Sequence, residues 1–479
     1  MFIDKINYRV HSNNPFVVWT DSKIIDERLS ANSYNQDYLN FRKAKNTFNF
    51  KKLSDIAKVT AMIGWKGLTT DNYVNEDGVY LLRTVDIKDN FIDLENTVMA
   101  EREKVYEQPQ IILKQGDIIF SKDGTLGVTA IVPRYQNEEM CVGSTLARIR
   151  LSSKVDNYYV CAAFMSRIVQ AQIKYFVSGI AQPHITQEYI NKLEIPIPSP
   201  EIQKYIGDKV RKAEELREEA KRLKKEAEEI IYKELNISVL ENKFKDLNNK
   251  YTWVDPTNLE NRVDSKYYDE KVLKIKNYFN KHYYTLKLKD CLQYCARGKS
   301  FAQNCEEGII LIKTKNLNNS IISYEENFVC EKEVNNNLIL KEKDLLFASM
   351  GVGSLGKIDM YYPIKEKSTI DGTLTLLRFR NDCKLKPEYV MEFIRTQIGQ
   401  KLVYQNVVGS TGIISISVED LINIDIPFIE IEKQEKISKN VGKYLANFYT
   451  SKQLIQEAKQ DVEDLIEGNF DMSKVKANN

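Results

Sequence analysis

The sequence predicts an α+β protein in which two similar mixed α/β units are joined by long helices that form an antiparallel coiled coil. Three observations lead to this prediction. The chain repeats itself after about 230 residues. Each copy contains short apolar runs typical of strands, and each copy is followed by a long charged helix with an apolar seam. At 479 residues the chain is also too long for one ordinary hydrophobic core.

The repeat is visible in markers that keep their order and nearly constant spacing. Gly78 begins Gly-Val-Tyr-Leu-Leu-Arg-Thr-Val-Asp-Ile, and Gly308 begins Gly-Ile-Ile-Leu-Ile-Lys-Thr-Lys-Asn-Leu. Leu113 begins Leu-Lys-Gln-Gly-Asp-Ile-Ile-Phe, and Leu340 begins Leu-Lys-Glu-Lys-Asp-Leu-Leu-Phe. Because chance similarity would not hold one register over so many places, the chain is a duplication.

Within each copy the elements follow the same order. The apolar runs that predict strands are Val79–Val85, Ile118–Phe120, Val128–Val132 and Leu146–Leu151, then Ile309–Lys313, Leu345–Phe347 and Leu374–Phe379. A helix-like stretch comes next, at 158–175 and 387–404, and a shorter one follows at 186–193 and 417–422. Both copies then close with a strand that ends in Ile-Pro.

Two long helices complete the pattern, at about 201–235 and 430–468. Apolar residues recur at the spacing of a coiled-coil seam. The seams are Ile206, Ala213, Leu216, Ala220, Leu223, Ala227 and Ile230, then Ile437, Val441, Tyr444, Phe448, Ser451, Ile455, Ala458, Val462 and Leu465. We expect the two helices to pair with each other, because isolated helices would leave these seams in water.

Composition bounds the class of protein. The chain is 43% hydrophobic and 28% charged, as in soluble globular proteins. It has neither a membrane-length apolar run nor a signal-peptide pattern at its beginning, so we expect a cytoplasmic protein. Seven cysteines in such a chain suggest mostly reduced thiols. The net charge of +2 neither favours nor excludes a nucleic-acid partner.

Motifs for catalysis are scarce. Gly351 to Gly356 satisfies G-x-G-x-x-G, but the P-loop serine or threonine is replaced by Ile358, and the residues beyond predict a strand. We therefore interpret this segment as a tight turn between strands rather than a phosphate site. Asn13-Asn14-Pro15-Phe16 resembles the adenine-methylase tetrad but lacks its first proline, so a loop is the better interpretation.

Cysteines and histidines do not form an evident site. Four cysteines gather in the second copy, at Cys291, Cys295, Cys305 and Cys330. A zinc site usually shows two close pairs and the second is missing, so we expect buried thiols, with zinc as the alternative. The three histidines are too scattered to suggest a nucleophile and its base. We place His184 in a polar turn that faces solvent or a ligand.

The order of motifs resembles the specificity subunits of Type I restriction–modification systems. The block Gly116-Asp-Ile-Ile-Phe-Ser-Lys-Asp-Gly-Thr-Leu-Gly127 is similar to a strand and turn of their target-recognition domains. So is the segment from Ser178 through Ile195-Pro196 to the helix that bears Gln203, and the second copy repeats it from Gly409 through Ile426-Pro427 to Gln434. The second copy departs in two places: Gln182 has no counterpart, and the turn at 350–356 is two residues longer.

This resemblance implies a domain organisation. It comprises an N-terminal extension (1–25), a first target-recognition domain (26–200), a central helix (201–235), a linker with a second target-recognition domain (236–429), a C-terminal helix (430–468) and a tail (469–479). It implies no catalytic residue, metal or cofactor of the chain's own. The partners it implies are double-stranded DNA with a split target site, two adenine-N6 methyltransferase subunits that bring S-adenosylmethionine, and a translocating nuclease subunit for restriction.

Polar residues at the same strand ends of both copies are the candidate DNA contacts, because core packing does not require them there. They are Arg83, Lys88, Lys122, Asp123, Thr125, Ser178, Gln182 and His184 in the first copy, and Lys313, Lys315, Asn316, Ser349, Ser354, Lys357, Ser410 and Thr411 in the second. Two alternatives stay open: a specificity subunit of a Type IIB-like enzyme, and a coiled-coil scaffold whose heads bind protein.

Overall fold

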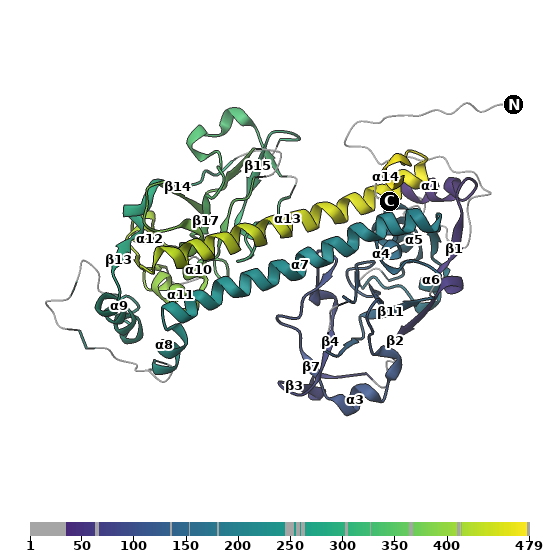
Figure 1. The fold of residues 1–479 in the computed structure, drawn as a ribbon, viewed down its shortest axis with the longest axis horizontal. Coiled ribbons are helices and arrows are strands. Elements are labelled where there is room, and N and C mark those ends of the chain that lie inside the picture. Colours follow the sequence, from purple (N-terminus) through teal and green to yellow (C-terminus); the bar gives the residue numbers. More distant parts are fainter. Residues whose placement is uncertain are drawn as a thin grey trace. The chain divides into compact units, whose positions relative to one another are not determined.

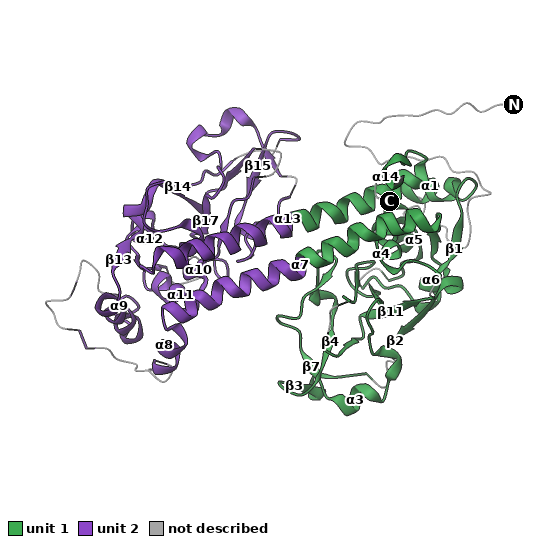
Figure 2. Ribbon diagram, viewed as in Figure 1, with its two compact units in different colours: residues 1–216, 450–479 green, residues 217–449 purple. Residues whose placement is uncertain are grey.

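The computed structural model describes most of the chain (Figure 1). The described residues are 35–62, 67–134, 137–152, 154–179, 182–244, 253–254, 259, 264–301, 305–325, 327–363, 367–409, 412 and 414–476. They form two compact units (Figure 2). Unit 1 contains the described residues up to Leu216 and from Thr450 on, and unit 2 contains those from Arg217 to Tyr449. Helices α7 (Pro200–Glu234) and α13 (Ile431–Glu467) each contribute residues to both units.

Unit 1 is built on two four-stranded sheets, in the orders β2-β11-β8-β9 and β10-β4-β7-β3. Its strands are β1 (Phe50–Lys52), β2 (Ala57–Ala61), β3 (Tyr73–Val74), β4 (Val79–Leu82), β5 (Ile87–Lys88), β6 (Phe91–Ile92), β7 (Met99–Ala100), β8 (Ile118–Ser121), β9 (Thr129–Ile131), β10 (Met140–Val142), β11 (Leu146–Leu151) and β12 (Glu194–Pro196). Its shorter helices are α1 (Gln36–Ala44), α2 (Leu53–Ile56), α3 (Arg102–Tyr106), α4 (Asn157–Met165), α5 (Arg167–Phe176), α6 (Gln187–Lys192) and α14 (Ser473–Lys476).

Unit 2 has sheets in the orders β14-β20-β17-β18 and β16-β15-β19. Its strands are β13 (Thr285–Lys287), β14 (Leu292–Arg297), β15 (Ile309–Ile312), β16 (Phe328–Val329), β17 (Leu345–Ala348), β18 (Ile358–Met360), β19 (Ser368–Ile370), β20 (Leu374–Phe379) and β21 (Asp425–Pro427). Its shorter helices are α8 (Ile237–Lys243), α9 (Glu270–His282), α10 (Pro387–Arg395), α11 (Gln397–Tyr404) and α12 (Val418–Ile422).

The topologies of the two units match, which confirms the internal repeat. Strand β8 pairs antiparallel with β9 and β11, and β17 pairs antiparallel with β18 and β20. In the second sheets the pairs β4–β10 and β15–β19 are parallel. All four residues of β8 are buried, because Ile118 and Phe120 face one apolar core and Ile119 faces another. A strand buried on both faces has a continuous apolar run, as the sequence shows here.

Two predicted strands are too long. Val79–Val85 ends as a strand at Leu82, and Ile309–Lys313 ends at Ile312. The chain leaves each sheet because a side chain three residues on accepts a backbone N–H: Asp86 from Arg83 at 2.8 Å, and Asn316 from Lys313 at 2.8 Å. These bonds close short 3₁₀ helices, Thr84–Asp86 and Thr314–Asn316.

The prediction of one helix after each sheet is also wrong, because each stretch forms two helices. The chain is extended at Ser166 between α4 and α5, and at Thr396 between α10 and α11. The hydroxyl of each accepts the N–H three residues ahead, from Val169 and from Gly399, and so caps a new helix. The shorter predicted helices are confirmed as α6 and α12.

The long helices are confirmed and pack together within each unit. In unit 2, Lys433 contacts Glu234 at 2.8 Å, while Asn440 contacts Glu226 at 3.4 Å, so α7 and α13 run antiparallel there. In unit 1, Lys209 forms an ion pair with Asp461 at 2.6 Å.

The predicted seam is correct at most positions. In α7, however, Leu216 and Ile230 are only half-buried. The buried residue at the end of this helix is Ile231, one position after the predicted one.

The Gly351–Gly356 segment lies between β17 and β18, as the tight-turn interpretation predicts. Its three glycines have positive φ angles, which side chains disfavour. Residues 13–16 lie outside the described residues. None of the helices in the part of the chain that the structure describes is long and apolar enough to cross a membrane.

The cysteines differ from the prediction at one pair. Cys305 and Cys330 form a disulfide, whereas Cys141, Cys161, Cys291, Cys295 and Cys383 are free. The pair comes together because Cys305 donates its N–H to Phe328 at 2.9 Å, beside the strand that leads to Cys330. No group of three or more metal-ligating side chains occurs among the described residues.

Candidate functional site

The turn after β8 meets the loop that follows α5. Two backbone hydrogen bonds join them, from Gly124 to Pro183 at 3.1 Å and from Ile185 to Lys122 at 2.9 Å. His184 also forms isolated β-bridges with two other residues of this region. The backbone thus brings together four of the predicted contacts, Lys122, Asp123, Ser178 and His184.

A third segment closes this arrangement. Lys122 donates its N–H to the carbonyl of Thr145 at 2.9 Å. The hydroxyls of Thr84 and Thr145 lie 3.2 Å apart. The segment that follows β4 therefore also contacts this group of loops. We call the described residues of 84, 122–125, 145 and 178–184 the first polar edge.

Unit 2 repeats this frame bond for bond. Gly351 donates to Ile414 at 3.1 Å, and Ile416 donates to Ser349 at 3.0 Å. Ser349 in turn donates to Thr373 at 3.0 Å, and the hydroxyls of Thr373 and Thr314 are hydrogen-bonded. We call the described residues of 314, 349–357, 373 and 408–416 the second polar edge.

The side chains on the two frames differ. On the first edge Lys122 pairs with Asp123 at 2.6 Å, and Ser178 Oγ lies 3.1 Å from His184 Nε2. On the second edge Val408 pairs with Ser415 in the backbone bridge that Ser178 and His184 form on the first. One frame therefore presents two different chemical surfaces.

The three histidines are too scattered along the sequence to suggest a nucleophile and its base, but the structure places Ser178 Oγ beside Nε2 of His184. A catalytic pair needs a third group that orients the base. Here Nδ1 of His184 contacts the carbonyl of Gln182 at 3.5 Å, and the Ser178–His184 pair is exposed. The arrangement can donate and accept hydrogen bonds toward a ligand, and these contacts contain no oriented nucleophile.

The remaining first-copy candidates are spread more widely. Thr125 and Gln182 are exposed. Arg83 binds Asp86 at 3.1 Å, and this hydrogen bond raises the pKa of the guanidinium. Lys88 pairs with Asp93 at 2.6 Å in the β5–β6 hairpin, which raises the pKa of its ammonium.

The second-copy candidates divide into accessible and buried residues. Ser354 and Lys357 lie on the turn, Lys313 is half-buried, and Lys315 is exposed and pairs with Glu325 at 2.5 Å. Asn316 and Ser349 are only 2% and 1% exposed. Asn316 donates to the carbonyl of Ser323, and Ser349 bonds the hydroxyl of Thr375. The two last candidates, Ser410 and Thr411, lie outside the described residues.

Sequence reasoning missed the threonines that tie each edge together. Thr84 and Thr314 occupy matching places in the repeat, so their position was readable from the sequence. Thr145 and Thr373 each follow a glycine-containing turn and directly precede strands β11 and β20. This is a weaker signal in the sequence.

Two cavities lie beside elements other than these edges. One, of about 520 Å³ in unit 1, is lined in part by Arg134, Lys154, Asp156 and Arg211. The other, of about 450 Å³ in unit 2, is lined by Lys243, Lys274, Lys281 and His282 together with Phe244, Asn277 and Tyr278. None of the predicted contacts lines either cavity.

The geometry defines a duplicated protein whose two similar units each carry a polar edge. Residues 45–229 match the family model of the Type I restriction modification DNA specificity domain. Over these residues the chain is similar to the specificity subunits of Type I restriction–modification systems. Two relatives with similar sequences are named as specificity subunits of type I restriction enzymes.

The named relatives come from Methanocaldococcus jannaschii. The MjaX specificity subunit of a type I restriction enzyme is 27% identical over 131 residues, which are 27% of this chain and 29% of that protein. The MjaVIII specificity subunit is 24% identical over 166 residues, 34% of this chain and 39% of that protein. The matched segments thus span less than half the length of either relative.

Two solved structures are similar at low identity. The S subunit of a Type-I restriction-modification system from M. genitalium is 13% identical, with a TM-score of 0.43 over 89% of this chain and 97% of that chain. The HsdS subunit from Thermoanaerobacter tengcongensis is 14% identical, with a TM-score of 0.30 over 88% of this chain and 97% of that chain.

Proposed function

We propose that the chain is the DNA sequence-specificity subunit of a Type I-like restriction–modification complex and that it recognises a bipartite DNA target. The observation that carries this proposal is the pair of polar edges, which share one backbone frame and differ in side chains. Because different side chains prefer different bases, two such edges suit a target of two unlike halves. The family match supports the same function.

Each edge would read DNA through polar groups that are exposed, as on the first edge, or half-buried, as on the second. Gln182 and His184 on the first edge and Ser354 and Lys357 on the second have donors and acceptors that suit base edges and phosphates. Lys315 and Lys88 already pair with carboxylates, so each would exchange that partner for a phosphate on binding. Asn316 and Ser349 would act by holding the backbone of the second edge.

The partners follow from the family resemblance. In this proposal α7 and α13 dock two adenine-N6 methyltransferase subunits, which supply S-adenosylmethionine and flip the target adenine out of the stack. A translocating nuclease subunit joins them for restriction. A helix of 35 residues is about 50 Å long, a length that suits half-sites about one DNA turn apart.

Binding by the reconstituted complex tests the proposal first. The chain and its methyltransferase subunits should shift duplex DNA that carries the host's methylated motif, and rising salt should weaken the shift because phosphate contacts release counterions. A complex that binds no duplex at low salt would support the scaffold alternative. Cleavage on both sides of the site by a two-subunit enzyme would identify the Type IIB-like alternative.

Single substitutions then assign the edges. Gln182→Ala should weaken recognition of one half-site, and Lys357→Ala should weaken binding through the other. The loss is about 1–3 kcal/mol where a base-edge contact is removed. Methylation at unchanged rates by both variant complexes would reject these contacts.

The proposed domains should also be exchangeable. Replacing residues 26–200 with the same region of a relative should change one half of the methylated motif and keep the other. Methylation-sensitive sequencing reads both halves at once. Changes in both halves would reject independent recognition by the two domains.

A further inference from the structure

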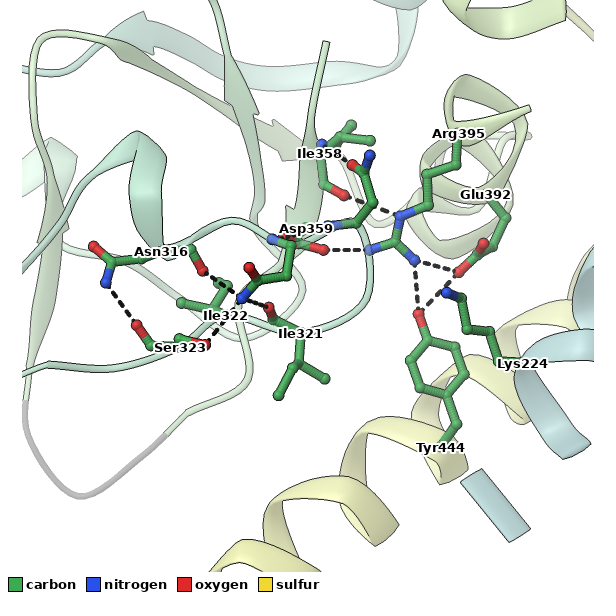
Figure 3. A network of polar contacts seen from close by, with 12 residues as sticks. Lys224, Asn316, Ile321, Ile322, Ser323, Ile358, Asp359, Glu392, Arg395 and Tyr444 are labelled. Atoms are coloured by element: carbon green, nitrogen blue, oxygen red, sulfur yellow. Dashed lines mark hydrogen bonds and ion pairs between the residues drawn. The ribbon is translucent and has the colours of Figure 1, made fainter. Parts of the chain in front are cut away.

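Figure 3 shows a group of charged and polar side chains of unit 2 that contact one another. It contains Asp359 on β18, Glu392 and Arg395 on α10, and Tyr444 on α13. The side chains of Asp359 and Glu392 are 0% exposed, and that of Arg395 is 7% exposed. Taking charges out of water is unfavourable unless each charge finds partners, so the contacts of this group decide what it does.

Arg395 is the centre of the group. Its Nη2 pairs with Asp359, and its Nη1 contacts Glu392 at 2.7 Å and the Tyr444 hydroxyl at 3.0 Å. Its Nε donates to the carbonyl of Ile358 at 3.0 Å. Burial opposes the charge, but the surrounding carboxylates and hydroxyl raise the pKa of the guanidinium above its usual value. Arg395 is therefore a charged tie between β18, α10 and α13.

The second oxygen of Asp359 extends this tie to a loop. It accepts the backbone N–H of Asn318 at 2.6 Å and that of Asn319 at 3.2 Å. The same loop is held at Ile322, whose N–H and carbonyl both bond the hydroxyl of Tyr449 on α13. Residues 316–323, which we call the anchored loop, follow directly after the candidate contacts Lys313 and Lys315.

Unit 1 has no such group at the matching positions. Ala130 pairs with Ile119 in β9, as Asp359 pairs with Leu346 in β18. Met165 precedes the capping residue Ser166, as Arg395 precedes Thr396. By the same alignment Ala162 takes the place of Glu392.

The residue of unit 1 that matches Tyr444 can be identified from a glutamine that occurs near the start of both long helices. Gln203 donates to the Pro198 carbonyl and accepts an N–H from the residue just before α4, and Gln434 repeats both bonds with Ile429 and the residue just before α10. Counting ten residues along each long helix from this glutamine leads to Ala213 and Tyr444. The four charged or polar residues of unit 2 thus replace Ala130, Ala162, Met165 and Ala213 of unit 1.

We propose that Asp359 and Arg395 are positioning residues that fix the anchored loop, and with it the second polar edge, to helix α13. In unit 1 a different contact, the partly exposed ion pair of Asp89 with Lys452 at 3.2 Å, joins the matching loop to α13. This inference rests on the proposed function. A buried ion group adds little net stability but fixes geometry, which suits a loop whose side chains must meet DNA in one arrangement.

The test replaces the tie with the residues of unit 1, as Asp359→Ala and Glu392→Ala together with Arg395→Met. Removing all three charges at once avoids leaving Glu392 buried without its ion-pair partner, so the variant should fold. The amides of Asn318 and Asn319 should exchange hydrogen about tenfold faster or more, because they lose their acceptor. In the reconstituted complex, discrimination at the second half-site should fall about tenfold while the first half-site is read as before.

A second buried pair of unit 2 supplies the control. Arg378 and Asp344 pair at 2.6 Å, and their bonds go to the 337–341 segment instead of the anchored loop. Asp344→Ala with Arg378→Met should destabilise the same unit but leave Asn318 and Asn319 exchange unchanged. If the test variant and this control variant speed the exchange equally, the tie is ordinary core structure and the proposal fails.

Three outcomes are decisive. A folded Asp359→Ala/Glu392→Ala/Arg395→Met chain with native exchange and native reading of the second half-site overturns the proposal. If that chain does not fold, Asp359→Asn, which keeps the volume and loses the charge, should show faster exchange at the two amides, and native exchange or failure to fold overturns the proposal. If even the native complex binds no DNA, the proposed function fails, while the exchange measurement still decides whether the loop is tied.

Discussion

Cys141 and Cys161 lie in the interior of unit 1, where burial raises the pKa of each thiol to about 12. The thiolate is the reactive form of cysteine, so these side chains are protected twice, by their pKa and by the surrounding core. In unit 2 burial raises the pKa of Cys295 to about 11. Cys305 and Cys330, by contrast, are already joined to each other.

Iodoacetamide near pH 8 should therefore modify the cysteines of the native chain to different extents. Cys141 and Cys161 should stay unmodified, because only about one in 10⁴ of such thiols is ionised at that pH. Cys305 and Cys330 should react only after a reductant is added. Peptide mass spectrometry measures each site, and rapid labelling of Cys305 without reductant would contradict the disulfide.

Ion pairs should differ in their effect on stability according to burial. Asp344 is 2% exposed, and it accepts two hydrogen bonds from Arg378, so Asp344→Ala leaves a buried guanidinium without its partner. We expect unit 2 to lose about 3 kcal/mol of unfolding free energy. The matched control is Glu331→Ala, because Glu331 and its partner Lys367 are both well exposed and should contribute less than about 0.5 kcal/mol. Urea titration compares the two, and equal losses would contradict the argument.

At the scale of elements, one hydroxyl in each unit decides where a helix begins. Ser166 is fully buried; its Oγ donates to Ala163 at 2.7 Å and caps α5. Thr396 does the same for α11, where it donates to Phe393 at 2.7 Å. These caps turn one apolar stretch into two helices, of which α4 packs against β9 and α10 against β18.

Removing a cap should cost about 1 kcal/mol of unfolding free energy, so Ser166→Ala and Thr396→Ala should each lower the denaturation midpoint. Thr396→Ser is the control, because it keeps the hydroxyl and unit 1 already has serine at this position. Chemical denaturation measures all three. A Thr396→Ser variant as unstable as Thr396→Ala would show that the methyl group, and not the cap, is responsible.

At the scale of the whole molecule, the proposed function gives the long helices a length-dependent role. If their length sets the spacer between half-sites, adding seven residues near Ala220 and seven at the matching place in α13 should lengthen the helix pair by about 10 Å. B-DNA rises about 3.4 Å per base pair, so the unspecified spacer should grow by about three base pairs. The sequences of the half-sites should stay the same.

Mapping of methylated adenines across the genome measures this spacer. An insertion in one helix alone is the control, since it should strain the helix pair and lower stability instead of moving the spacer. A double insertion that leaves the spacer unchanged would mean that the helices do not set it.

The sequence by itself determined the features that depend on neighbouring residues or on repetition. The duplication, the long helices, the buried strand β8 and the tight turn at Gly351 all follow from local periodicity, apolar runs and glycine, which act within a few residues. The same holds for the polar residues that cluster at matching turns, such as Lys122 and Ser349.

Only the tertiary structure decided which distant residues meet. Strands β2 and β14 escaped prediction because their pairing with β11 and β20 supplies what their short sequences do not signal. The approach of Ser178 to His184 and the tie from Asp359 to Arg395 depend on backbone bonds between separate segments, and such contacts leave no periodic trace in the chain. The physical reason is that local propensity acts over one turn or strand, whereas burial and hydrogen-bond satisfaction act across the whole core.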